Sequence, residues 1–155
     1  MNYKEKISEN FTWEEFKVSK DHSDLAAKIE FTEKQKENLK NLVTFIIQPV
    51  RTFLNESVTV LSGVRSNELN IAVKGSKTSD HPYGNAGDIT SNKIYTNLKK
   101  IAYDIWDLLE KNKVIKQLIY YPGRNFIHLS INTEGRPEKH ELLRALKNGK
   151  YIKEK

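Results

Sequence analysis

Two histidines and one aspartate are the residues of this chain best suited to metal chemistry. His81 and Asp88 lie seven residues apart in a segment that also contains Gly84 and Gly87. Glycine permits tight backbone returns that other residues avoid, so the two side chains can converge on one point. A His–Asp hydrogen bond in a surface turn is the simpler alternative. The sequence has no cysteine, so any transition-metal site must use histidine and carboxylate.

His128 is the third candidate. It lies in the apolar segment 125–131, where alternation predicts a strand that turns His128 away from its aliphatic neighbours Ile127 and Leu129. A lone histidine in such a strand is commonly a core residue with satisfied hydrogen bonds. Together with the loop pair, however, it completes a set of two histidines and one carboxylate. That set leaves a fourth position open for water, which is the general form of a catalytic zinc site.

The elements that must position these residues are predicted from periodicity. Apolar residues recur every three or four positions over residues 33–54, which predicts the longest helix, with a kink or break at Pro49. Thr32 followed by Gln35 forms a capping-box pattern at its start. A second such pattern near the N-terminus predicts a short helix over residues 12–16.

The remaining segments predict strands around a long loop. Residues 63–87 show no periodicity, and a loop of that length inside a compact domain is uncommon and usually functional. The order of elements predicts an α+β fold in a single domain, residues 1–155, with helices on one side of an antiparallel sheet. The other predicted elements are strands at 58–62, 86–90, 116–121 and 125–131, a helix at 95–112 and a weak helical patch at 142–146.

At this metal loop the sequence resembles a known family. Ser79-x-His81-x-x-Gly84-x-Ala86-x-Asp88 matches, position for position, the SxHxxGxAxD signature of the zinc D-alanyl-D-alanine carboxypeptidases and L-alanyl-D-glutamate endopeptidases, including phage endolysin relatives. The resemblance continues in the family's order and spacing over most of the chain. The further segments are Phe11–Phe16 with Ser19, Gln48–Arg51, Ser62–Ser66, Leu69–Asn70, Gly75–Ser76, Gln117–Ile119 and Ile127–Ser130.

The resemblance implies a hedgehog/D,D-peptidase-like fold with a zinc site at the sheet edge. It implies that His81, Asp88 and His128 hold Zn2+. It further implies that Arg65 points at the substrate carbonyl or carboxylate and that Ser79 hydrogen-bonds in the substrate pocket. A guanidinium beside a metal can stabilise an oxyanion and bind a carboxylate in a bidentate way. The alternatives are a surface salt bridge for Arg65 and a turn-stabilising role for Ser79.

One feature departs from the family pattern. Many members carry a glutamate a few residues before the second histidine, which acts as general base, but no carboxylate occurs between Leu118 and His128. A positioned base contributes about 10²–10⁴-fold, and zinc alone lowers the pKa of bound water to about 7, so turnover could survive its loss. Tyr121 is the catalytic candidate in this segment and Tyr120 a substrate-binding candidate. Packing is the alternative role for both.

These observations predict a zinc metallopeptidase that hydrolyses an amide bond in peptidoglycan stem peptides, as a D,D-carboxypeptidase or an endolysin-type endopeptidase. The missing glutamate favours an alternative, a catalytically inactive zinc-binding module of the hedgehog-like kind that binds the wall or belongs to a virion. A peptide-release assay with and without chelator separates the two.

Charge and hydropathy set the expected partners and location. The net charge of +6 suits an anionic partner such as a cell wall, and the lysines are spread along the chain without any nucleic-acid-binding module. We therefore expect no nucleic-acid partner. No apolar run approaches the ~20 residues of a membrane span, and the N-terminus has no signal-peptide pattern. We expect a monomer made in the cytoplasm that acts at the wall after phage- or prophage-type release, or is virion-associated.

Overall fold

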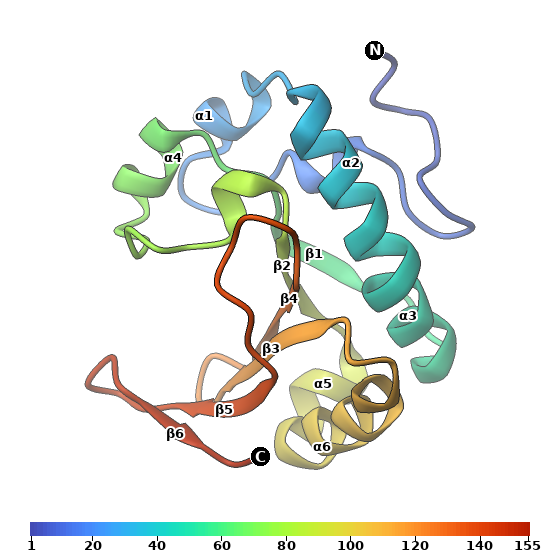
Figure 1. The fold of residues 1–155 in the computed structure, drawn as a ribbon, viewed down its shortest axis with the longest axis vertical. Coiled ribbons are helices and arrows are strands. Elements are labelled where there is room, and N and C mark those ends of the chain that lie inside the picture. Colours follow the sequence, from blue (N-terminus) through green and yellow to red (C-terminus); the bar gives the residue numbers. More distant parts are fainter.

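Six strands form one sheet with the order β1-β2-β4-β3-β5-β6 (Figure 1). All neighbouring strands are antiparallel except β3 and β5, which are parallel. The structure is a computed structural model that describes residues 1–155. The strands are β1 (Thr59–Ser62), β2 (Ala86–Thr90), β3 (Ile115–Tyr121), β4 (Phe126–Ile131), β5 (Glu141–Ala145) and β6 (Tyr151–Lys153).

The helical segments are short apart from one composite helix and α6. None of them is long and apolar enough to cross a membrane. The predicted α+β class is confirmed, and the four predicted strands occur within one residue of their expected bounds. The helical elements are η1 (Glu14–Phe16), α1 (Ser23–Ala27), α2 (Glu33–Leu42), η2 (Val43–Ile47), α3 (Gln48–Leu54), α4 (Asn67–Ala72), η3 (His81–Tyr83), α5 (Asn92–Thr96), α6 (Leu98–Leu109) and η4 (Glu110–Asn112).

The predicted long helix forms as α2, η2 and α3 in succession. Thr32 and Gln35 make the expected capping box, with the Gln35 N–H 3.1 Å from the Thr32 hydroxyl and the Thr32 N–H 2.9 Å from the Gln35 side-chain oxygen. The predicted irregularity near Pro49 is a π-helical turn, η2, in which the Gln48 N–H bonds to the Val43 carbonyl five residues back. Pro49 then lies in the first turn of α3, where its missing N–H is tolerated.

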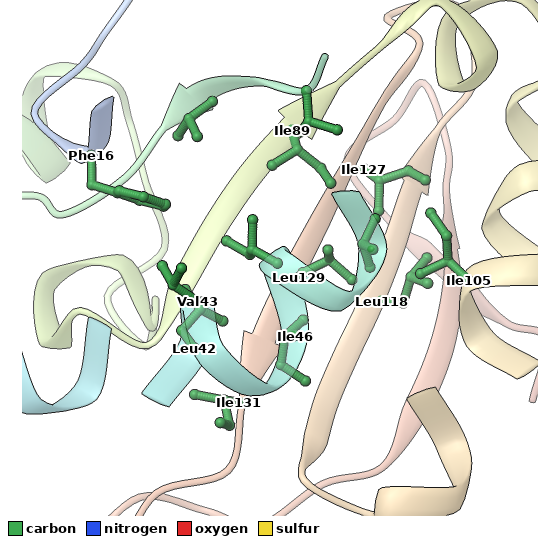
Figure 2. Packing of buried hydrophobic residues seen from close by; sticks show 14 of the residues in the cluster. Phe16, Leu42, Val43, Ile46, Ile89, Ile105, Leu118, Ile127, Leu129 and Ile131 are labelled. Carbon is green, nitrogen blue, oxygen red and sulfur yellow. The ribbon is translucent and has the colours of Figure 1, made fainter. Parts of the chain in front are cut away.

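The apolar stripe of α2 and η2 packs on one face of the sheet. Figure 2 shows Ile46 near Leu129 of β4, with Leu42 on the preceding turn of the helix. On the other side of the strand, Ile105 of α6 lies next to Leu118. A cluster of 30 buried residues forms this core, and each fully buried Leu or Ile side chain contributes about 1.5–3 kcal/mol. Successive strand residues alternate between faces, so the neighbours of these aliphatic residues point to the other, polar side of the sheet.

Two predicted segments differ in detail from the structure. The N-terminal helix is a single 3₁₀ turn, because the Phe16 carbonyl accepts from the Val64 N–H and so joins the region after β1 instead of a further helical turn. The loop 63–87 is not structureless. It contains α4, capped by the Ser66 hydroxyl on the Leu69 N–H at 3.0 Å, and the 3₁₀ turn η3.

The predicted helical patch at 142–146 is wrong. This segment is β5, which pairs with β3 on one side and β6 on the other. Leu142 and Leu143 are adjacent and both buried, which a strand achieves by burying one on each face. Pairing with β5 also satisfies the backbone groups of β3, which would otherwise form an exposed sheet edge.

Glu154 closes the fold near the C-terminus. Its carboxylate accepts from the hydroxyls of Tyr103 on α6 and Tyr120 on β3, and it lies 2.9 Å from the Nε of Arg144. Hydrogen bonding from the Tyr103 and Tyr120 hydroxyls lowers the pKa of Glu154 below its ordinary 4.5. The carboxylate therefore ties the helical layer to strands β3, β5 and β6.

We predict that Glu154→Gln lowers the free energy of unfolding near neutral pH by about 1–3 kcal/mol, because a hydrogen-bonded carboxylate is lost. The folded-state pKa of Glu154 is depressed, so its contribution is present above pH 4.5 and is lost as the pH falls through the folded pKa. The difference between wild type and variant should therefore shrink in acid. Denaturant titrations near neutral pH and in acid measure this difference in the free energy of unfolding. The variant Glu138→Gln, at an exposed glutamate, is the control. A pH-independent difference would contradict the prediction.

Candidate metal centre

His81, Asp88 and His128 converge on the polar face of the sheet. Asp88 on β2 and His128 on β4 are paired directly across the antiparallel ladder, and His81 opens η3 above them. The His128 Nδ1 lies 2.8 Å from the Asp88 Oδ1, and the His81 Nε2 lies 3.3 Å from the same oxygen. One donor atom from each residue lies within 4.8 Å of the other two. The structure thus brings together the three residues proposed from sequence.

A backbone carbonyl determines which nitrogen of His81 faces the site. The His81 Nδ1 lies 2.7 Å from the Gly63 carbonyl oxygen, which only accepts, so Nδ1 carries the proton and Nε2 presents a lone pair. The ring is only 2% exposed, and this burial lowers the pKa of His81. Gly63 must be glycine here, since a Cβ would come within 2.4 Å of the Phe16 carbonyl oxygen.

Asp88 supplies the negative charge of the site. Burial by itself would raise the pKa of Asp88, but the charges and hydrogen bonds of His81 and His128 outweigh it and hold that pKa well below its ordinary value. The site therefore combines an ionised carboxylate oxygen with the imidazole nitrogens of two histidines. This donor set, converging from three directions, fits a zinc ion in the arrangement that leaves one coordination position open.

Arg65 is held against Asp88 by neutral side chains. Its guanidinium lies 3.2 Å from the Ser62 hydroxyl and 3.1 Å from the Asn70 side-chain oxygen, and its Nη2 lies 3.8 Å from the Asp88 Oδ2. Gly75 leaves room for this contact, since a Cβ there would lie 2.1 Å from the Asn70 oxygen. Asn70 and Gly75 belong to the motifs shared with the family, but the sequence alone assigned them no role. The structure shows that they orient the arginine.

Ser79 forms a local turn contact. Its hydroxyl accepts from the His81 N–H at 3.2 Å, which is the turn-stabilising alternative raised from sequence. The side chain is half-buried beside the metal group, so a hydrogen bond from Ser79 to substrate stays a prediction.

The two adjacent tyrosines of β3 lie on opposite faces of the sheet. Tyr121 pairs with Phe126 and faces the same side as His128. Its ring stacks on that of Phe126 at 4.3 Å between centroids, and burial raises the pKa of its hydroxyl. Tyr120 points into the core and bonds to Glu154. The substrate-binding role predicted for Tyr120 does not fit this placement, because its hydroxyl lies on the far side of the sheet.

No further carboxylate joins the metal group. The clustered donors are His81, Asp88 and His128 alone, and Asn125 occupies the turn before His128 with its φ at 55°. Tyr121 contributes a hydroxyl group on this face. With an ordinary pKa near 10 raised further by burial, its hydroxyl stays protonated at neutral pH and donates a hydrogen bond. The metal group itself contains no carboxylate other than Asp88.

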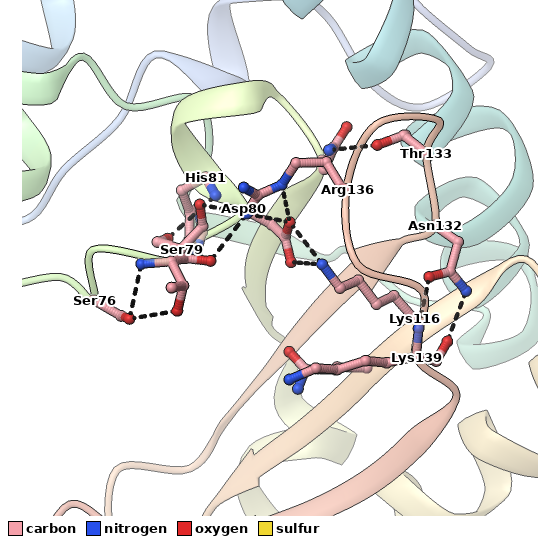
Figure 3. A network of polar contacts seen from close by, with 12 residues as sticks. Ser76, Ser79, Asp80, His81, Lys116, Asn132, Thr133, Arg136 and Lys139 are labelled. Carbon is pink, nitrogen blue, oxygen red and sulfur yellow. Dashed lines mark hydrogen bonds and ion pairs between the residues drawn. The ribbon is translucent and has the colours of Figure 1, made fainter.

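A buried ion pair fixes the loop that carries His81 (Figure 3). Asp80 is 6% exposed, and its carboxylate lies 2.9 Å from the Lys116 Nζ and 3.1 Å from the Arg136 Nη2. Lys116 is the extra residue at the register shift of β3. Arg136 also donates to the carbonyls of Thr78 and Ser79. This network was not predicted from the sequence. Its one signal there was Lys116, a lysine within an apolar strand.

The site has the donor set of a metal centre, and a comparison with protein families gives the class of protein. The family model described as Peptidase M15 matches residues 9–130 of the chain. The chain therefore belongs to the Peptidase M15 family, whose members are zinc-dependent metallopeptidases, and the resemblance seen in its motifs is confirmed. A search of curated proteins finds no match.

We predict that Arg136→Ala lowers zinc affinity roughly tenfold, because the segment next to His81 loses the hydrogen bonds to two backbone carbonyls and the ion pair with Asp80. Residues that orient metal ligands typically change affinity 10–100-fold. Competition with a chromogenic chelator measures the affinity. The exposed Lys139→Ala variant in the same loop serves as control. Unchanged zinc affinity in Arg136→Ala would show that the ion pair has no part in ligand placement.

Proposed function

We propose that this M15 peptidase hydrolyses an amide bond in peptidoglycan stem peptides, with His81, Asp88 and His128 as its zinc ligands. The observation that carries the proposal is the convergence of these donors within 4.8 Å, beside a guanidinium that neutral side chains hold in place. Zinc bound there would supply Lewis acidity for the scissile carbonyl and a water of lowered pKa.

Arg65 would stabilise the charge that develops on the carbonyl oxygen. Its side chain is only 13% exposed, so a hydrogen bond to an oxyanion would be little weakened by water. Ser62 and Asn70 already fix the guanidinium, and it therefore needs little reorganisation during the reaction. Because Arg65 has five N–H donors, it can keep these two partners and still face the substrate.

Tyr121 would act as a second hydrogen-bond donor on the same face, and not as the general base. A protonated phenol cannot accept the proton of an attacking water, but it can bind a substrate oxygen. The remaining carboxylate of the site is Asp88 itself, which the two histidines engage. Activity would therefore depend mainly on the metal and Arg65, at a lower rate than with a positioned base.

Charge and family resemblance support the proposed substrate and setting. A net charge of +6 favours association with the anionic cell wall and with the carboxylates of stem peptides. We place the protein as a phage- or prophage-type lysis enzyme or a virion component that acts on the wall after release. Both an endopeptidase and a D,D-carboxypeptidase specificity agree with the site, and they differ in the fragments they release.

A second function is favoured by one observation, the lack of any carboxylate beyond Asp88 in the metal group. A domain with this site could bind zinc and wall peptides without hydrolysing them. It would then anchor a wall-binding or virion assembly.

We predict that the wild-type protein releases peptide fragments from purified peptidoglycan and that His81→Ala and chelation abolish release, because each removes the metal. Zinc added after chelation should restore activity to wild type only. Mass spectrometry of the fragments identifies the bond that is cut. One equivalent of bound zinc with no fragment released would contradict hydrolysis and support the wall-binding function.

We predict that Arg65→Lys lowers kcat about 10²–10³-fold while zinc affinity stays unchanged, because one fixed oxyanion donor is lost. Lysine cannot bond Ser62 and Asn70 and still reach the substrate, since its single ammonium lacks the planar fork of arginine. Arg51→Lys on α3, far from the site, is the control. A change in KM alone would show that Arg65 only binds substrate.

A further inference from the structure

Strands β5 and β6 lie beyond residue 130, outside the segment matched to the Peptidase M15 family. They extend the same sheet that carries the metal group (Figure 1). The pairing register connects them to it directly. His128 pairs with Ile119, Ile119 with Leu143, and Leu143 with Lys153, so these side chains share one face of the sheet.

Contacts on the opposite face confirm this alternation. Arg144 follows Leu143, and Glu154 follows Lys153. Arg144 bonds to Glu154, and Glu154 bonds to Tyr120 on the core side of β3. Since adjacent residues of a strand point to opposite faces, Lys153 must project on the side of His128. β6 therefore adds new side chains to the face on which the metal group lies.

Tyr151 lies beside Lys153 on this face. The two residues are two positions apart in β6, where they pair with Ala145 and Leu143. The Tyr151 side chain remains 50% exposed. It therefore has surface available for a ligand.

Lys153 provides an unpaired cation at the far end of this face. It is exposed and takes part in none of the ion pairs of the structure. Three strand spacings separate it from His128, or about 14 Å at ~4.8 Å per strand. An extended peptide covers about 3.4 Å per residue. A carboxylate about four residues from the scissile bond would therefore reach the Lys153 ammonium.

We propose that Tyr151 and Lys153 form a specificity subsite that binds a carboxylate of an extended peptide whose scissile bond lies at the metal group. The inference rests on the proposed peptidase function and adds the polarity and length of the preferred substrate. Lys153 supplies the charge, and the Tyr151 hydroxyl supplies a hydrogen bond. Short or amidated peptides would lack this contact.

The test compares a synthetic stem pentapeptide that has free carboxylates with the same peptide fully amidated, using the zinc-loaded full chain. We expect Lys153→Gln to raise KM and the calorimetric Kd for the acidic peptide about fivefold, the upper range for an exposed ion pair. We expect kcat, zinc content and binding of the amidated peptide to be unchanged. Tyr151→Phe should weaken binding of the acidic peptide in the same selective way.

Lys40→Gln on α2 is the control for net charge, since α2 covers the other face of the sheet. Equal weakening by Lys40→Gln would indicate long-range steering and overturn the subsite. So would identical Kd values for wild type and Lys153→Gln, or a lack of any peptide binding. If wild type binds the acidic peptide through Lys153 but cleaves neither peptide, the subsite stands and the proposed hydrolysis falls.

Discussion

The antiparallel pairing of β2 with β4 is the contact on which the rest of the structure depends. It sets Asp88 directly opposite His128 on the polar face, while Ile89 and Ile127 pair on the core face. Burial of the aliphatic face under α2 and α6 determines the register, because a slip of one residue would turn the aliphatic set to solvent. The same hydrophobic free energy that stabilises the core therefore positions two of the proposed ligands.

The third proposed ligand is positioned by weaker but numerous polar contacts. Helix α2 holds η3 through bonds from the Gln35 and Asn38 side chains to the carbonyls of Pro82 and Tyr83, at 2.8 and 2.9 Å. The buried Asp80 ion pairs hold the other side of the turn. Removing one partner of such a buried pair is costly, because it leaves a charge without compensation. His81 is thus constrained from the helical layer and from the C-terminal region.

The site contains more groups that can stabilise negative charge than groups that can act as a general base. Arg65 is oriented by Ser62 and Asn70, and Tyr121 adds a neutral donor. No carboxylate occurs between Leu118 and His128, and the turn before β4 contains Asn125 with a positive φ. In the proposed hydrolysis, electrostatic stabilisation would supply most of the rate enhancement, and the C-terminal strands β5 and β6 would enlarge the face on which a substrate lies.

Much of this molecule follows from local sequence patterns. The capping box at Thr32, the apolar stripe of residues 33–54 and the alternation around His128 depend on neighbours a few residues away, so the sequence alone predicts them. The metal group was also predictable from its signature. Tertiary structure decided the rest: β5 is a strand because β3 and β6 pair with it, and Asp80 meets Lys116 and Arg136 across 36 and 56 residues. The sheet register likewise determines that Tyr121, and not Tyr120, lies on the same face as the metal group. These outcomes depend on long-range contacts, whose partners no local pattern specifies.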